Sequence, residues 1–178
     1  LQISFNEKTQ RKRSGGCSCM IRRREIIMKL YVAYGSNLDK EQMKYRCPSA
    51  RPVQSGYLDN WQLIYRGSKT GAYASIRYKK GCRVPVGLWE ITKHDERFLD
   101  RYEGYPIFYQ KKNIFVHLGD GSRVKAMVYI MRSDASPGTP SKQYLRTILR
   151  GYADFGLDES YLIRSILQSQ QETGKERE

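Results

Sequence analysis

Apolar and polar residues alternate along much of the chain after residue 27, with the period of two that is typical of a half-buried β-strand. The pattern predicts a first strand that begins at Met28 and five later strands, at 56–65, 72–78, 84–90, 107–116 and 124–131. Lys80-Gly81 and Gly119-Asp120-Gly121 supply turn residues between neighbouring strands. The last two strands are therefore predicted to form one hairpin.

Four segments have a helical period instead, at 39–45, 92–102, 141–152 and 158–168. Asp39 with Gln42, and Thr92 with Asp95, have the three-residue spacing of a capping box at the start of a helix. Gly104 is placed to end the second helix. Because strands and helices mix along one chain without a repeat or a linker, we expect one α+β domain. Its antiparallel or mixed sheet can close into a barrel.

The two ends of the chain differ from this domain, which we expect to span 28–169. Residues 1–27 hold seven Lys or Arg against two Glu, a charge of +5, and show no clear periodicity. They are predicted to be a disordered or non-native basic extension, with Met28 as the natural first residue. A targeting peptide is the alternative, although the apolar face that it needs is weak. Residues 170–178 are predicted to be a polar, frayed tail.

Composition narrows the class of protein. With 178 residues, 39% of them hydrophobic, the chain can bury one core, and no run approaches the ~20 apolar residues of a membrane span. The net charge of +14 favours anionic partners. However, no zinc-finger, RNP, KH or helix-turn-helix pattern accompanies the charge, so nucleic-acid binding is an alternative that we do not favour.

The cysteines and histidines show no metal-site pattern. No secretory signal is visible, so Cys17, Cys19, Cys47 and Cys82 are predicted to be reduced thiols of a cytoplasmic protein. The Cys17-x-Cys19 spacing is not that of a zinc site, and His94 and His117 complete no ligand set with it. We therefore expect no metal.

The most informative segment is 30–38, where an apolar strand runs into the turn Gly35-Ser36-Asn37 and then into a helix-forming segment. Such a turn leaves several backbone N–H groups pointing one way, which suits an anion or a polarised carbonyl oxygen. It predicts a small-molecule site at the end of the first strand, without saying which molecule binds.

Two further residues are candidates for chemistry. Glu103 stands at the negative C-terminal end of a predicted helix, near Tyr102, Tyr105 and Phe108. Both features raise the pKa of a carboxyl, which suits a general acid/base. The alternative is a solvated glutamate that pairs with Arg101 or Lys93. Tyr129 alternates with aliphatic residues on a strand, so that its hydroxyl can face a site, although a core tyrosine is the usual explanation.

Several motifs, taken in order, resemble the γ-glutamylcyclotransferase family, including its AIG2-like and butirosin-pathway relatives. The motifs are Tyr31-Val32-Ala33-Tyr34-Gly35-Ser36-Asn37-Leu38, Cys47-Pro48-Ser49-Ala50, Gly87-Leu88-Trp89-Glu90-Ile91, Leu99-Asp100-Arg101-Tyr102-Glu103-Gly104, Val128-Tyr129-Ile130-Met131, Pro140 to Tyr144, and Gly151 with Gly156-Leu157 and Tyr161. The resemblance covers about residues 28–168 and leaves the basic extension outside.

The resemblance implies a small mixed or antiparallel β-barrel flanked by helices, and a γ-glutamyl cyclotransferase that needs no cofactor. It implies that Glu103 is the catalytic acid/base, and that Tyr129 contacts the substrate region. The γ-glutamyl group would be bound by Tyr31, Val32, Ala33, Tyr34, Gly35, Ser36 and Asn37. In the implied reaction the α-amine of a γ-glutamyl group attacks its own γ-carbonyl, which yields 5-oxoproline and a free amine.

The sequence leaves two other functions open, a non-catalytic binding module of the same fold and a basic nucleic-acid-binding protein. The partner that we expect is a small γ-glutamyl substrate and not a membrane. The segments 105–109 and 66–73 are candidates for the wall that selects the leaving amine. The sequence assigns neither that amine nor an oligomeric state.

Overall fold

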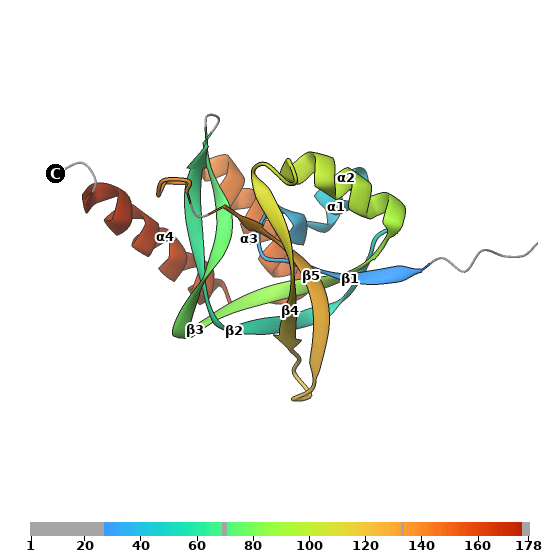
Figure 1. The fold of residues 1–178 in the computed structure, drawn as a ribbon. Helices are drawn as coiled ribbons and strands as arrows, with labels where there is room; N and C mark the ends of the chain where they lie inside the picture. Colours follow the sequence, from blue (N-terminus) through green and yellow to red (C-terminus); the bar gives the residue numbers. More distant parts are fainter. Residues whose placement is uncertain (1–26, 69–70, 133, 176–178) are drawn as a thin grey trace, which may run out of the picture.

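The computed structural model describes residues 27–68, 71–132 and 134–175. Five strands form a closed barrel in the order β1-β3-β2-β4-β5 (Figure 1). Their bounds are Met28–Ala33 (β1), Arg51–Ser68 (β2), Gly71–Thr92 (β3), Tyr109–His117 (β4) and Arg123–Met131 (β5). The contact between β1 and β5 that closes the barrel is parallel, while the other pairs are antiparallel. The mixed barrel predicted from the sequence is therefore confirmed.

The predicted division of the segment 72–90 into two strands is wrong. The segments 72–78 and 84–90 belong to one continuous strand, β3, and β2 is correspondingly long. The register shifts between Asp59 and Trp61, where Asn60 has a positive φ of 65°. The Asn60 side chain accepts the N–H of Gly81 at 3.0 Å. Lys80-Gly81 thus marks a bulge that bends the hairpin, and not a turn that ends a strand.

In the described residues, four α-helices and one 3₁₀ helix accompany the barrel. Their bounds are Ser36–Leu38 (η1), Lys40–Arg46 (α1), Lys93–Glu103 (α2), Lys142–Phe155 (α3) and Glu159–Lys175 (α4). The Thr92–Asp95 capping box is present in full, and the Asp39 side chain accepts the N–H of Gln42. Helix α4 continues to Lys175, so the tail that was expected to fray from Gln170 is helical up to that residue. The predicted basic extension lies outside the described residues, apart from its last residue.

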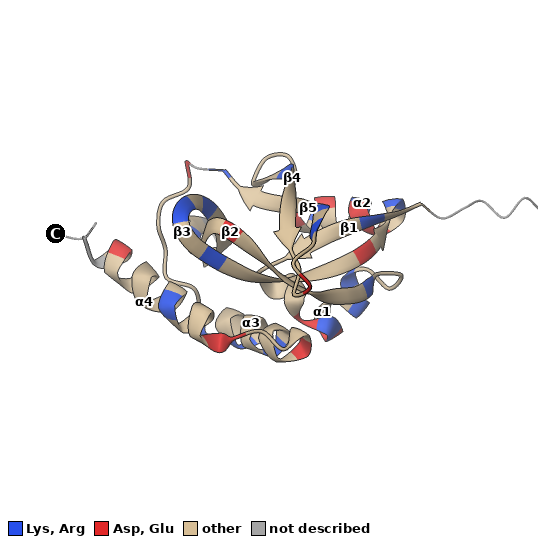
Figure 2. Ribbon diagram, turned by 90° about the horizontal axis from the view of Figure 1, so that it is seen from below, with Lys and Arg blue, Asp and Glu red and all other residues tan. Residues whose placement is uncertain are grey.

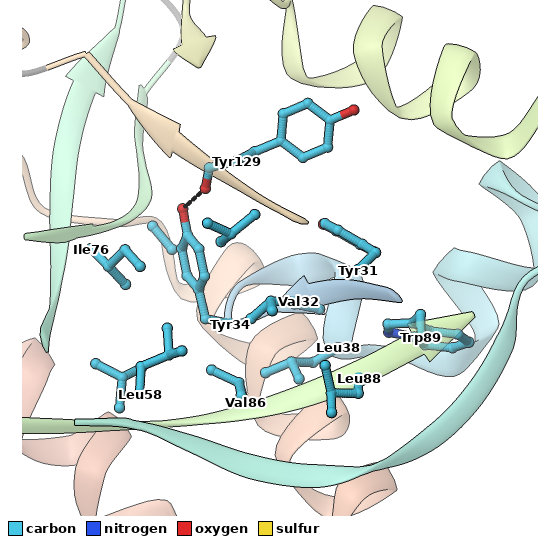
Figure 3. Close-up of a cluster of buried hydrophobic side chains, with 14 of the residues drawn as sticks. Tyr31, Val32, Tyr34, Leu38, Leu58, Ile76, Val86, Leu88, Trp89 and Tyr129 are labelled. Carbon is cyan, nitrogen blue, oxygen red and sulfur yellow. Dashed lines mark hydrogen bonds between the residues drawn. The ribbon is translucent and has the colours of Figure 1, made fainter. Parts of the chain in front are cut away.

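Close packing of α3 on η1 places the turn that follows β1. Gly151 of α3 faces this turn, and a Cβ atom added there would lie 2.3 Å from the Leu38 Cβ. Only a glycine permits this approach. The side chains of Leu38, Met43 and Ile148 are fully buried between the barrel and the helices. The apolar cluster shown in Figure 3 thus holds the turn in place through Leu38.

Positive charge is spread over the molecule. Figure 2 shows Lys and Arg on β3, α1, α3 and α4, and not on one element alone. In the described part of the chain, no helix is both long enough and apolar enough to cross a membrane.

Candidate active site

A cavity of about 690 Å³ lies where β1 runs into η1 and where α2 ends. Its wall combines the turn, the end of α2, the middle of the barrel and the start of α3. Seven tyrosines line it, from four strands, two helices and the turn after β1: Tyr31, Tyr34, Tyr73, Tyr102, Tyr109, Tyr129 and Tyr144. An aromatic wall with hydroxyl groups is typical of a small-molecule site.

Five of the seven predicted residues of the first strand and its turn line this cavity. They are Tyr31, Tyr34, Gly35, Ser36 and Asn37. Val32 and Ala33 do not line it, and each of their side chains is 1% exposed in the apolar core. Alternation along β1 explains the difference between Tyr31 and Val32, because consecutive residues of a strand face opposite sides.

The turn is compact, and its N-terminal end is open. The N–H of Leu38 donates to the Gly35 carbonyl at 3.0 Å, and no side chain caps η1 at Gly35. The N–H groups of Ser36 and Asn37 therefore lie at the open end of a helical turn, next to the cavity. Gly35 has an ordinary φ of −119°, but a Cβ atom there would lie 3.2 Å from the Ala74 Cβ and from the Tyr144 hydroxyl. Space, and not backbone conformation, favours glycine at this position.

Glu103 is the last residue of α2, and its carboxyl lines the cavity. Its Oε1 accepts a hydrogen bond of 2.8 Å from Asn37 Nδ2. Burial raises the pKa of this carboxyl from an ordinary 4.5 to about 7, while the Asn37 hydrogen bond and the Arg46 charge act in the opposite direction. The structure gives Glu103 a hydrogen bond from Asn37 and, among the described residues, no ion pair with Arg101 or Lys93.

The aromatic residues near Glu103 are more open than expected. Tyr102 and Phe108 line the cavity but are 50% and 60% exposed, and Tyr105 does not line it. Tyr31, 3% exposed, is the more deeply buried neighbour. The cavity wall is therefore more closed at Tyr31 of β1 than at Tyr102 and Phe108.

Asn37 is the centre of a hydrogen-bond network that joins the turn to Glu103. Its Nδ2 donates to Glu103 and also to the Tyr31 hydroxyl, at 2.7 Å. Its Oδ1 accepts from Arg46 Nη1 at 2.5 Å. Arg46 was not among the residues predicted from the sequence. Its one local signal is the spacing of four residues from Gln42, whose side chain bonds to it along α1.

Tyr129 lies in the cavity wall but does not contact Glu103 through its hydroxyl. This hydroxyl donates to Asp100 Oδ1 at 2.6 Å. The pKa of Tyr129 is raised, mainly by burial and secondly by the Asp100 carboxylate. The Tyr129 carbonyl accepts the Tyr34 hydroxyl at 2.6 Å (Figure 3). In Figure 3 the Tyr129 ring points away from the apolar cluster. The hydrogen bonds of Tyr34 and Tyr129 therefore join the turn, β5 and α2 in the wall of the cavity.

Both segments that were proposed for the leaving-group wall contribute to the cavity. Ile107, Phe108 and Tyr109 line it from one segment, and Gly67 and Tyr73 from the other. The histidines lie elsewhere, with His94 against the Phe98 ring and His117 3.6 Å from Asp59. Across residues 27–68, 71–132 and 134–175, no three His, Cys, Asp or Glu side chains cluster as metal ligands, and Cys17 and Cys19 lie outside the described residues.

Comparison with known proteins points to one family. Residues 31–147 match the family described as "Gamma-glutamyl cyclotransferase, AIG2-like". The chain is 31% identical over 140 residues to γ-glutamylcyclotransferases of Homo sapiens and Mus musculus, a match that covers 74% of this chain and 74% of each relative.

Solved structures agree with this match. One is a γ-glutamyl cyclotransferase with a TM-score of 0.73 and 28% identity. The match covers 78% of this chain and 86% of the γ-glutamyl cyclotransferase chain. A second is an uncharacterised protein from Homo sapiens with a TM-score of 0.72, 29% identity and the same coverage of both chains.

Proposed function

The chain belongs to the γ-glutamyl cyclotransferase, AIG2-like family, and on that premise we propose that it converts a γ-glutamyl amide into 5-oxoproline and a free amine, with Glu103 as acid and base. One observation carries the assignment of Glu103. The Glu103 carboxyl lies at the cavity and is hydrogen-bonded to Asn37 of the turn after β1. Its pKa of about 7 suits proton transfer in both directions.

The reaction is an intramolecular acyl transfer. Glu103 takes a proton from the α-ammonium group, and the resulting amine attacks the γ-carbonyl carbon. A new C–N bond closes the ring, the old C–N bond breaks, and Glu103 returns its proton to the departing amine. The second proton that the ring nitrogen loses leaves with the same amine, which departs as an ammonium ion. The nucleophile and the electrophile belong to one molecule, so the protein contributes proton transfer and charge stabilisation more than proximity.

Donors at the turn would hold the glutamyl group and its developing oxyanion. The N–H groups of Ser36 and Asn37 lie at the open end of η1, and one such donor is often worth ~3 kcal/mol. The Tyr31 hydroxyl is a third donor. Burial raises its pKa well above the usual value, so the hydroxyl keeps its proton, and Asn37 occupies one of its lone pairs.

Replacement of Glu103 by Gln tests this proposal. The variant keeps the size of the side chain and an acceptor for Asn37 but cannot exchange a proton. We expect 5-oxoproline release from γ-glutamyl amino acids to fall about 10²- to 10⁴-fold. The matched control is Glu41→Gln, at an exposed glutamate of α1. Undiminished turnover of the Glu103 variant would contradict the assignment.

A panel of substrates tests the wider proposal. The γ-glutamyl half is kept constant while the amine is varied among amino acids, peptides and simple amines, and 5-oxoproline is quantified by chromatography. If the unaltered protein binds these compounds in calorimetry but releases no 5-oxoproline from any of them, the chain is a binding module of this fold.

A further inference from the structure

The Arg46 guanidinium, at the end of α1, is held on three sides. Nη1 donates to Asn37 Oδ1 at 2.5 Å and lies 3.4 Å from Ser36 Oγ. Nη2 donates to the Gln42 side chain, and the guanidinium carbon lies 3.8 Å from the centre of the Tyr102 ring. These contacts give a long side chain one defined position next to the turn.

This position determines which way the Asn37 amide faces. A guanidinium group has donors and no acceptor, so the Asn37 atom next to it must be the carbonyl oxygen. The amide nitrogen then lies on the opposite side and donates to both Glu103 and Tyr31. If the amide turned over, its NH₂ would face the donors of Arg46, and Glu103 would face an oxygen.

We propose that Arg46 is a positioning residue that acts through Asn37. It fixes the amide of Asn37 so that one side chain holds both the Glu103 carboxyl and the Tyr31 hydroxyl toward the cavity. The proposal rests on the proposed role of Glu103, but it concerns a residue that need not touch the substrate.

The charges around Glu103 agree with such a role. Arg46 of α1 is the cation that lowers the pKa of Glu103. Arg101, Arg132 and Asp134 also line the cavity. The remaining groups that interact electrostatically with Glu103 are hydroxyls whose pKa is raised, first by burial: Tyr31 of β1, Tyr34 of the turn, Tyr109 of β4, Tyr129 of β5 and Tyr144 of α3. Loss of Arg46 thus raises the pKa of Glu103 further.

A double-mutant cycle in the full chain tests the proposal. We expect Arg46→Met and Asn37→Ala each to lower kcat/KM about 10- to 100-fold, with the acidic limb of the pH profile at higher pH. The double variant should lose no more than Asn37→Ala alone, because the two residues act in series. Fully additive losses, or an unshifted limb in Arg46→Met, would overturn the proposal.

Controls separate positioning from support of α1. Arg150 also anchors the start of α1, through Asp39 at 2.8 Å, but it does not contact Asn37. Arg150→Met should therefore lower the melting temperature without moving the limb. Arg46→Lys keeps the charge and loses the planar fork, so it should retain a limb near that of the unaltered protein at reduced kcat. If the acidic limb lies at the same raised pH in Arg46→Lys as in Arg46→Met, the charge argument is contradicted.

One measurement does not depend on activity. Carbon-13 NMR of labelled Glu carboxyls, assigned with the Glu103→Gln variant, reports the titration of Glu103 directly. We expect its pKa to be higher in Arg46→Met than in the unaltered protein. An unchanged titration would overturn the inference, whereas failure of the proposed function would leave this result intact.

Discussion

The two ends of helix α2 carry two acidic residues in opposite situations. Asp95, in the first turn, is fully buried and accepts hydrogen bonds from Ser49 Oγ, from the Thr92 N–H and from Thr92 Oγ1. Glu103, in the last turn, accepts one hydrogen bond, from Asn37. The helix dipole stabilises a negative charge at the first position and disfavours it at the second.

This difference separates a structural carboxyl from a reactive one. A carboxylate with several donors at a helix N-terminus holds the fold together. A carboxyl with one amide donor, at the negative end of the same helix and open to a cavity, can accept and return a proton near neutral pH. The number of donors and the end of the helix therefore distinguish the two carboxyls, while burial is what raises the pKa of Glu103.

The largest expected effect is on activity, which should fall in a Glu103 variant and not in an Asp95 variant. Glu103→Gln should lower kcat by about 10²-fold or more, because only this carboxyl exchanges protons with the substrate. Asp95→Asn should keep kcat within a few-fold when rates are scaled to the folded fraction. The assay is 5-oxoproline release at a temperature well below both melting transitions. A loss of equal size in both variants would remove the distinction.

The next effect is on stability, which should fall in the Asp95 variant. Asp95→Asn places an NH₂ group among donors from Thr92 and Ser49. We expect the free energy of unfolding to fall by about 2–4 kcal/mol. Urea denaturation followed by circular dichroism measures it, with Asp120→Asn, in the exposed loop after β4, as the control. A change below ~1 kcal/mol would show that this capping box is dispensable.

The turn opposite Glu103 gives a steric test. Gly35→Val places methyl groups against Ala74 and Tyr144, where even a Cβ atom already lies at 3.2 Å. We expect kcat/KM to fall about 100-fold, because small displacements of a site are costly. The matched control is Gly119→Val, since a Cβ atom there meets nothing within 4 Å. Unchanged kcat/KM in Gly35→Val would argue against close approach of the substrate to the turn.

The smallest effect is the dependence of stability on pH. Because the pKa of Glu103 rises from 4.5 to about 7 on folding, the folded state binds a proton that the unfolded state releases between these values. This contribution is full below pH 4.5 and is lost as the pH rises through about 7.

Relative to the unaltered protein, Glu103→Gln should therefore gain about 1–3 kcal/mol of stability between pH 5 and pH 8, since Gln does not titrate. Chemical denaturation of both proteins at the two pH values measures the gain. A constant difference between them would mean that folding leaves the pKa of Glu103 unperturbed.

Much of the architecture was predictable because its signals are local. Period-two alternation marked the strands, and the Thr92–Asp95 spacing located the start of α2. Strand β3 was divided wrongly because Lys80-Gly81 has the composition of a turn, whereas pairing with Asn60 makes it a bulge. Local composition cannot show which partner strand lies opposite.

The site was predictable to the same extent. The segment from Tyr31 to Asn37 and the helix-end Glu103 could be selected as candidates, because each is conspicuous in its own segment. Arg46 could not, because nothing near it in the sequence indicates that α1 turns it back toward Asn37. Tyr129 could be selected from strand alternation and lies in the cavity wall, but the partner of its hydroxyl, Asp100 of α2, could not be foreseen from the strand.

By itself, the sequence determined most of the elements, the caps at Asp39 and Thr92, the glycine-containing turn after β1 and the acidic end of α2, because each depends on residues within a few positions of one another. Tertiary structure alone decided that Asn37 and Glu103, 66 positions apart, meet at 2.8 Å. That contact requires the pairing of β1 with β3, since α2 follows β3 directly. Burial of the carboxyl at the cavity wall is likewise a tertiary effect, and burial is what raises its pKa to about 7.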